Sequence, residues 1–158
     1  MIEFLYTSRY TLDEKPNLDD LKVHAELYAI ADKYEITHLA SEAKLRYCKV
    51  IQTLWDPGAF LNSIHSIYDL TSDTNRGLRD IVVACVRRRR RELSHGDEIP
   101  ALFRNVCHDV PAFSADMIGS FMQSPLLGRC HDCGPDQLVE ALQLRCLHCG
   151  KGGASDAW

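Results

Sequence analysis

The chain has 158 residues, of which 46% are hydrophobic and 25% are charged, and its formal net charge is -4. These values are typical of a globular protein with one domain or two small ones, and the length suffices to bury a core. The mild negative charge argues against broad electrostatic binding of nucleic acid. Because no run of 18 or more apolar residues occurs, no membrane span is expected.

The cysteines and the start of the chain predict its compartment. No basic region followed by an apolar stretch opens the sequence, so no signal peptide is expected. The seven cysteines are an odd number, which without such a signal favours reduced thiols over a disulfide framework. We therefore expect an intracellular protein, located in the nucleus or the cytoplasm.

The pattern from residue 21 to residue 124 is mainly helical, and the first helix is expected over Leu21–Tyr34. One set of apolar residues recurs at helical spacing along one face, and a second set widens that face. The first set is Val23, Leu27, Ile30 and Tyr34, and the second is Leu21, Ala25, Tyr28 and Ala31. A stripe of this breadth predicts a helix that is buried on more than one side.

Three further helices are predicted next. Thr37 is expected to cap the second helix, and Asp56 before Pro57 predicts the start of the third. After the polar residues 71–75, a longer fourth helix is predicted to continue to Leu93. The apolar residues at helical spacing in these three are Leu39, Ala43, Tyr47, Val50 and Leu54, then Phe60, Leu61, Ile64, Ile67 and Tyr68, then Leu78, Val82, Cys85 and Leu93.

Two shorter helices close the helical part. The first is marked by the apolar residues Ile99, Leu102, Phe103 and Val106. Ser114 is expected to cap the second, with Phe113 and Ile118 at the spacing of a hydrophobic staple. After residue 124 the helical periodicity stops, and only a short strand around residues 142–146 is predicted.

The five consecutive arginines Arg87–Arg91 lie inside the fourth predicted helix. At 100° per residue they surround the helix rather than form one flat patch. The favoured interpretation is a solvated helix end whose cations complement the helix dipole, with the stem of Arg89 over the edge of the core. A nuclear-import or nucleic-acid-binding role stays open.

Two Cys-x-x-Cys-Gly stretches carry the clearest chemical signal. Four thiolates at this spacing suit one tetrahedral zinc ion, and the glycines permit the tight turns around each sulfur. The predicted metal ligands are Cys130, Cys133, Cys146 and Cys149. Four thiolates complete the coordination shell, so the site is expected to be structural. Unligated thiols and a redox pair are the alternatives.

The first third of the chain resembles the C-terminal half of a BTB/POZ domain. Residues Phe4–Tyr10 are similar to the YLYTG-x-Y stretch of that family, with Ser8 in place of the usual glycine. Leu21–Tyr34 resembles the helix that follows there, and Leu39, Ala40 and Ala43 match the next helix. Tyr68–Leu70 followed by Asn75–Asp80 is similar to the helical region after the BTB domain in many filamentous-fungal proteins, some of which end in a cysteine-pair segment.

We therefore expect a mainly α protein with BTB/POZ-like helices, a helical extension and a small zinc-ribbon-like segment. The expected divisions are residues 1–54 for the partial BTB/POZ domain, 55–124 for the helical region, 125–150 for the zinc-ribbon-like segment and 151–158 for a flexible tail. Complete BTB/POZ domains have further strands and helices before the matched stretch. Without them, the broad apolar face of Leu21–Tyr34 is expected to be exposed and to favour association.

The resemblance implies a non-catalytic protein–protein interaction module, an adaptor or scaffold linked to cullin-type ubiquitin ligases. Its implied partners are a cullin-type scaffold or another BTB protein, and self-association is expected from the family. The expected contact residues are Tyr6, Tyr10, Val23, Leu27 and Tyr28. The alternative is a zinc-binding, nucleic-acid-associated transcriptional regulator. No catalytic constellation is visible, so an enzyme is not expected, and a zinc-dependent or redox enzyme is a third interpretation.

Overall fold

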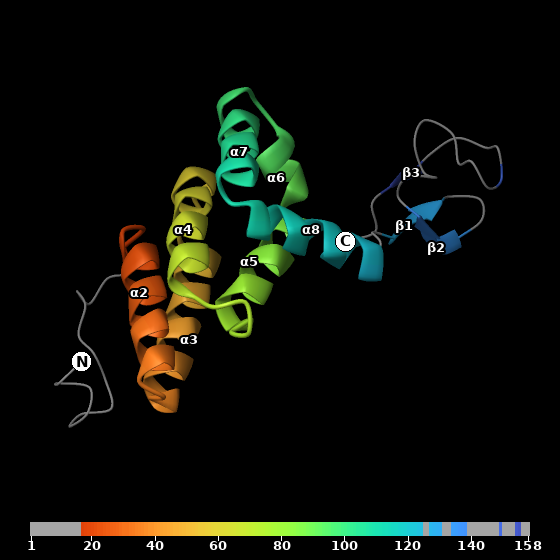
Figure 1. Ribbon diagram of the computed structural model, residues 1–158. Coiled ribbons are helices and arrows are strands. Elements are labelled where there is room, and N and C mark those ends of the chain that lie inside the picture. The colour runs from red at the N-terminus through yellow and green to blue at the C-terminus, as the bar shows by residue number, and fades with distance from the viewer. Residues whose placement is uncertain (1–16, 125–126, 131–133, 139–148, 150–153, 156–158) are drawn as a thin grey trace. The chain divides into compact units, whose positions relative to one another are not determined.

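The protein is described by a computed structural model, which covers residues 17–124, 127–130, 134–138, 149 and 154–155 (Figure 1). The chain divides into two compact units, residues 1–115 and residues 116–158. The fold is mainly helical, as predicted. Within the described residues, no helix combines the length and the apolar character that a membrane crossing requires.

Seven helices are described, and most agree with the predicted segments. They are α2 (Asp20–Lys33), α3 (Thr37–Thr53), α4 (Pro57–Leu70), α5 (Gly77–Arg88), α6 (Arg90–Ser94), α7 (Glu98–Asp109) and α8 (Pro111–Gln123). In the first unit, α2 packs against α3 and α4, and α4 also contacts α5 and α7 (Figure 1). Helix α4 therefore lies at the centre of this unit.

The core follows the predicted apolar pattern. Phe60, Leu61, Ile64 and Ile67 of α4 have no exposed surface. Helix α4 also begins as predicted, because Oδ1 of Asp56 accepts a hydrogen bond from the backbone N–H of Ala59 at 2.6 Å and Pro57 follows at the first helical position.

A Schellman motif ends α2 and sets the path into α3. The N–H of Ile36 donates to the carbonyl of Ala31 at 2.8 Å, and the N–H of Glu35 donates to the carbonyl of Asp32 at 3.1 Å. Glu35 adopts a φ of 56°, the left-handed region in which this motif places its turning residue. Ile36 then packs onto the buried pair Ala31 and Leu39. The motif thereby fixes the position of the last turn of α2.

Three predicted details are wrong. Thr37 is the first residue of α3 and makes no capping hydrogen bond. The fourth predicted helix is interrupted at Arg89, whose φ of -103° and ψ of 20° leave the helical region, so that α5 and α6 are separate. Ser114 lies inside α8 rather than before it, and its hydroxyl donates to the carbonyl of Cys107 at 2.7 Å. Because α8 starts at Pro111, Phe113 is not positioned for the predicted staple.

The second unit contains a three-stranded antiparallel sheet in the order β2-β1-β3. Its strands are β1 (Leu127–Cys130), β2 (Gly134–Leu138) and β3 (Ala154–Ser155). The register of the β1–β2 pair shifts between Gly128 and Cys130, where β2 has one residue more than β1. The strand predicted around residues 142–146 lies outside the described residues, and β3 lies in the stretch that was expected to be a flexible tail.

Candidate functional site

Helix α2 carries apolar side chains on two faces, and one of these faces builds the core. The core face is buried to 7% exposure or less and consists of Leu21, His24, Ala25, Tyr28 and Ala31. On the adjacent face, Val23 and Leu27 are half-buried, Ile30 is 39% exposed and Tyr34 is 59% exposed. We call Val23, Leu27, Ile30 and Tyr34 the α2 stripe.

The α2 stripe is anchored at its inner edge by α3. Leu27 packs, together with Ile36 and Ala40, against the buried pair Ala31 and Leu39. The stripe is therefore part of a packed surface and not a frayed helix end. Its two residues nearest the C-terminal end of α2 present most of the exposed apolar area.

Charged side chains border the α2 stripe on its outer side. Nζ of Lys22 lies 3.9 Å from Oε1 of Glu26, and both side chains are exposed. Lys33 is also exposed, and its Nζ lies 6.0 Å from the centre of the Tyr34 ring. An apolar stripe flanked by charges of both signs has the composition of a protein-contact surface.

The five residues expected to contact a partner are distributed unequally. Tyr6 and Tyr10 lie outside the described residues. Val23 and Leu27 belong to the α2 stripe. Tyr28, however, lies in the core at 7% exposure, and its hydroxyl binds Asn75. Tyr28 is therefore a core residue and does not lie on the expected contact surface. The exposed face of α2 is the one on which helical periodicity groups Ile30 and Tyr34 with Val23.

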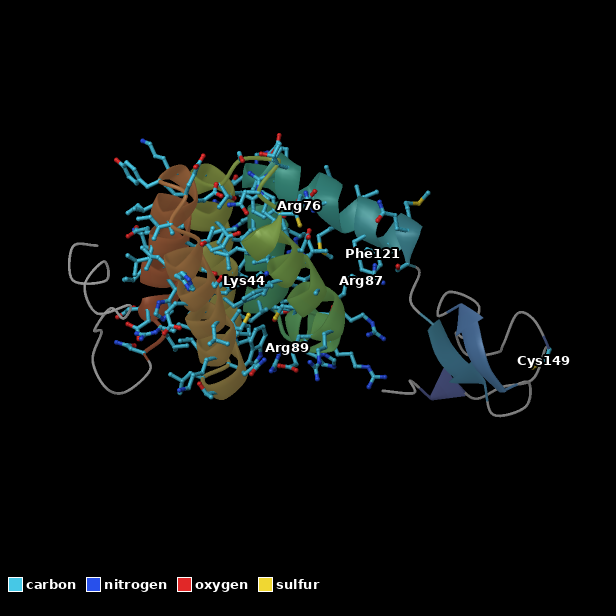
Figure 2. The ribbon with its side chains drawn as sticks, turned by 90° about the horizontal axis from the view of Figure 1, so that it is seen from below. Lys44, Arg76, Arg87, Arg89, Phe121 and Cys149 are labelled. Carbon is cyan, nitrogen blue, oxygen red and sulfur yellow. The ribbon has the colours of Figure 1, made fainter. Side chains whose placement is uncertain are left out.

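The arginine run is distributed around the α5–α6 segment. Arg88 and Arg91 are exposed, whereas Arg87, Arg89 and Arg90 are half-buried. The guanidinium of Arg89 lies 4.2 Å from the centre of the Trp55 ring and 3.2 Å from a carboxylate oxygen of Glu92. The expected contact of Arg89 with the core edge is thus confirmed. In Figure 2, Arg87 and Arg89 lie at different places around the segment. The run does not form one flat basic patch.

Two of the four predicted zinc ligands lie in described positions. Cys130 ends β1, and its register partner across the hairpin is Gly134, the first residue of β2. Cys149 lies in a turn before Gly150.

Cys133 and Cys146 lie outside the described residues, so the complete ligand set is not described. Among the residues that are described, no group of three or more His, Cys, Asp or Glu side chains is placed to hold a metal ion. The prediction of one structural zinc ion therefore stays a prediction, carried by the spacing of the four cysteines.

The three cysteines that lie in helices, unlike the four predicted zinc ligands, are poorly suited to bind a metal ion. Cys48, Cys85 and Cys107 are half-buried in α3, α5 and α7. Burial raises the pKa of each thiol, to about 11 for Cys85. At neutral pH these groups are protonated, which makes them poor nucleophiles and poor metal ligands. They act as small apolar residues at the edge of the core.

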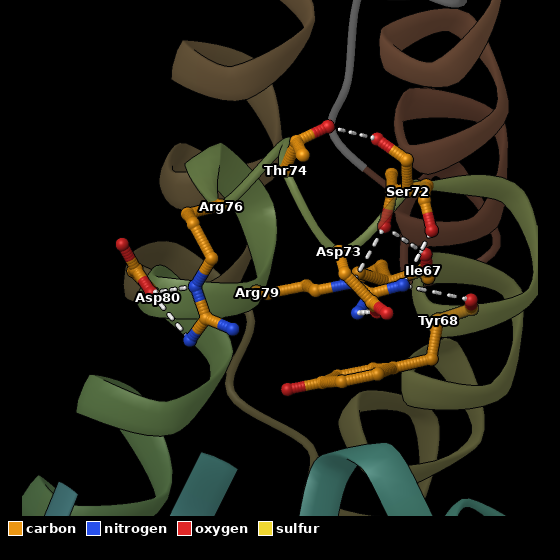
Figure 3. Close-up of polar contacts among 9 residues, drawn as sticks. Ile67, Tyr68, Ser72, Asp73, Thr74, Arg76, Arg79 and Asp80 are labelled. Atoms are coloured by element: carbon orange, nitrogen blue, oxygen red, sulfur yellow. Dashed lines mark hydrogen bonds and ion pairs between the residues drawn. The ribbon is translucent and has the colours of Figure 1, made fainter.

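Sequence reasoning missed Arg79, a buried cation in the first turn of α5 that binds the turn between α4 and α5. The guanidinium of Arg79, at 4% exposure, donates to Oγ1 of Thr71 at 3.0 Å and lies 4.5 Å from the centre of the Tyr68 ring (Figure 3). It also binds Asp73 at 2.5 Å, the carbonyl of Tyr68 at 3.2 Å and the carbonyl of Thr71. Every donor group of this side chain thus holds part of one turn, which indicates a structural role.

No family model, no curated protein and no solved structure matches this chain. The resemblance to the BTB/POZ domain accordingly stays a prediction from the sequence.

Proposed function

We propose that this chain is a non-catalytic protein–protein interaction module, an adaptor or scaffold of the BTB/POZ type. The α2 stripe is the observation that carries the proposal. It places two exposed apolar side chains, Ile30 and Tyr34, beside half-buried Val23 and Leu27 on a rigidly packed helix. An aromatic residue within an apolar stripe bordered by charges is typical of the centre of a protein interface.

The resemblance supplies the class of partner. The sequence Leu21–Tyr34 is similar to a BTB/POZ helix, and that family implies a cullin-type scaffold or another BTB protein as partner. In this proposal the zinc-ribbon-like segment, with Cys130, Cys133, Cys146 and Cys149 around one zinc ion, is a structural module. Its closed shell of four thiolates leaves no open position for a substrate.

The proposal is tested by binding of a purified cullin-type scaffold and of BTB proteins to the full chain. Tyr34→Asp places a charge in the α2 stripe and is expected to abolish binding. Leu45→Asp is the matched control, because Leu45 is 64% exposed on α3 and lies outside the stripe. Binding is expected to survive moderate salt and to be unchanged by the control. Circular dichroism checks that both variants retain their helices.

Two results would contradict the proposal. One is binding that is equally strong in the wild type and in the Tyr34→Asp variant. The other is binding to a DNA or RNA duplex that falls steeply with salt and is lost when Arg88 and Arg91 are replaced by alanine, since this would support the nucleic-acid-associated alternative.

A further inference from the structure

We infer that Ser94 is a phosphorylation site for a protein kinase that recognises arginine residues before the acceptor, with ATP as the phosphoryl donor. The inference goes beyond the proposed function, because Ser94 lies in α6 and belongs neither to the α2 stripe nor to the predicted zinc ligands. Three features carry it: the spacing of the arginines before Ser94, the exposure of its hydroxyl, and the short helix in which they lie.

The arginine run places positive charge at fixed distances before Ser94. Arg91 lies three residues before it and Arg89 five residues before it. No other serine or threonine of the sequence has an arginine or lysine three residues before it. In an extended segment alternate side chains point to the same side, so Arg89 and Arg91 enter one groove together. Guanidinium groups bind carboxylates through paired hydrogen bonds, so a kinase groove lined by acidic residues fits these two arginines.

The hydroxyl of Ser94 is accessible at the end of α6. The residue is exposed, and its Oγ donates to the carbonyl of Arg90 at 2.6 Å in a bond that is itself exposed to solvent. Water can replace such a bond at little cost in free energy. His95 already has extended backbone angles, with φ of -97° and ψ of 146°, and Gly96 follows with a left-handed φ of 77°. The chain therefore leaves the helix directly after the acceptor.

The segment before Ser94 is suited to local opening, which brings the acceptor and its arginines into an extended conformation. Helix α6 has five residues, and the break at Arg89 separates it from α5. Because so short a helix is not stable by itself, α6 depends on tertiary contacts. Leu93 is its buried residue, and Arg89 packs on the ring of Trp55. Release of these contacts opens the segment without unfolding the longer helices.

The reaction transfers one phosphoryl group. Oγ of Ser94 attacks the γ-phosphorus of ATP and loses its proton to the general base of the kinase. The Oγ–P bond forms while the bond from the γ-phosphorus to the bridging oxygen breaks, and ADP leaves. The product carries about two negative charges at neutral pH. Arg91 and Arg90 lie three and four residues before it, a spacing at which helical side chains meet, so they offset the unfavourable place of a phosphate at a helix C-terminus.

Incubation of the purified full chain with protein kinase B, magnesium and ATP with a radioactive γ-phosphate tests the inference. This kinase recognises arginines three and five residues before the acceptor. We expect phosphate to be incorporated, and mass spectrometry of the digested chain to locate it at Ser94. Ser94→Ala is expected to abolish this incorporation. Ser72→Ala, at an exposed position in the turn between α4 and α5, is the control and should leave incorporation unchanged.

Charge-conserving substitutions test the recognition of the arginines. Arg91→Lys keeps the positive charge but loses the paired hydrogen bonds, so we expect kcat/KM for phosphorylation to fall about 10-fold or more. Arg88→Lys is the matched control. Arg88 lies six residues before Ser94 and on the other side of an extended segment, so kcat/KM should change less than about 2-fold. Both arginines are exposed, and circular dichroism checks that the variants retain their helices.

The inference is overturned if Ser94 stays unmodified while a reference substrate of the same kinase is phosphorylated. It is also overturned if Arg91→Lys does not slow the modification of Ser94, or if casein kinase 2, which recognises acidic residues after the acceptor, modifies Ser94 faster. In that last case Asp97 and Glu98 would be the recognised residues. None of these outcomes bears on scaffold binding through the α2 stripe, which is tested separately.

Discussion

The hydroxyl of Tyr28 in α2 donates a hydrogen bond to Oδ1 of Asn75 at 2.5 Å, and the same oxygen accepts the backbone N–H of Gly77 at 3.2 Å. One side-chain oxygen therefore joins the middle of α2 to the first residue of α5. Burial raises the pKa of Tyr28, so its phenol stays protonated and keeps donating at neutral pH. The contact orients α2 and thereby the stripe on its other face.

Gly77→Ala is expected to destabilise the fold by about 1–3 kcal/mol, because overpacking forces neighbours to move. A Cβ atom at this position would lie 2.0 Å from the Tyr28 hydroxyl oxygen. Chemical denaturation monitored by circular dichroism measures the loss. The control is Gly119→Ala in α8, where a Cβ meets nothing within 4 Å and alanine should stabilise the helix. Equal stability of the Gly77→Ala variant and the wild type would contradict the close approach.

Arg79→Lys is expected to lower the free energy of unfolding by about 2–3 kcal/mol, mostly through lost hydrogen bonds in a buried place. A lysine ammonium lacks the planar set of donors that reaches Thr71, Asp73 and the carbonyl of Tyr68 together. Because the side chain of Asp73 is 90% exposed, the ion pair itself contributes little of this loss. Urea denaturation measures the change.

Arg76→Lys is the matched control for Arg79→Lys. Arg76 forms an ion pair with Asp80 at 2.9 Å in which both side chains are exposed. Screening by water weakens the contribution of such a pair to stability, so we expect the free energy of unfolding to fall by less than about 0.5 kcal/mol. If the two substitutions lowered the free energy of unfolding by similar amounts, burial of the Arg79 guanidinium would not increase its contribution to stability.

Stability is expected to fall as the pH is lowered below about 6.5 because of His24. Burial at 3% exposure lowers the pKa of this imidazole from its ordinary value of 6.5; Arg46 also lowers it, while Asp20 and Glu42 oppose the shift. Between the folded and unfolded pKa values the unfolded chain binds more protons. Lowering the pH through the range between these two pKa values of His24 therefore favours unfolding. Above this range, the full stability of the fold is present.

Denaturation midpoints measured between pH 5 and pH 8 (about the titration range of histidine) check the role of His24. His24→Gln should flatten the profile over this range. His38→Gln, at an exposed position of α3, should leave the profile unchanged. A pH dependence that persists in the His24→Gln variant would assign it to other groups.

The apolar periodicity was sufficient to predict the helices of the first unit, because their buried residues recur without interruption. It located the buried residues of α4 and the capping Asp56 correctly. It could not predict the break at Arg89, because Leu93 continues the same apolar phase and is buried in α6. The break depends on the backbone angles of one residue whose side chain contacts Trp55, a partner distant in sequence.

The sequence of α2 alone also could not show which of its apolar residues form the core face and which form the exposed α2 stripe. Both sets of residues are apolar, so hydrophobicity alone does not decide whether Tyr28 or Tyr34 is buried. The partner of the Tyr28 hydroxyl, Asn75, lies 47 residues away. For the same reason Arg79 could not be recognised as buried, since its acceptors become close only when the turn after α4 is formed.

The full chain is expected to bind about one zinc ion, which Cys146→Ser should abolish, since three thiolates do not complete a structural tetrahedral site. Chelation is expected to leave the helical circular dichroism signal nearly unchanged, because the helices of the first unit need no metal, while residues 125–150 become sensitive to proteolysis. Cys48→Ser is the control, because burial raises the pKa of Cys48 and keeps its thiol protonated. Elemental analysis of reduced protein measures the zinc, and a metal-free wild type would contradict the site.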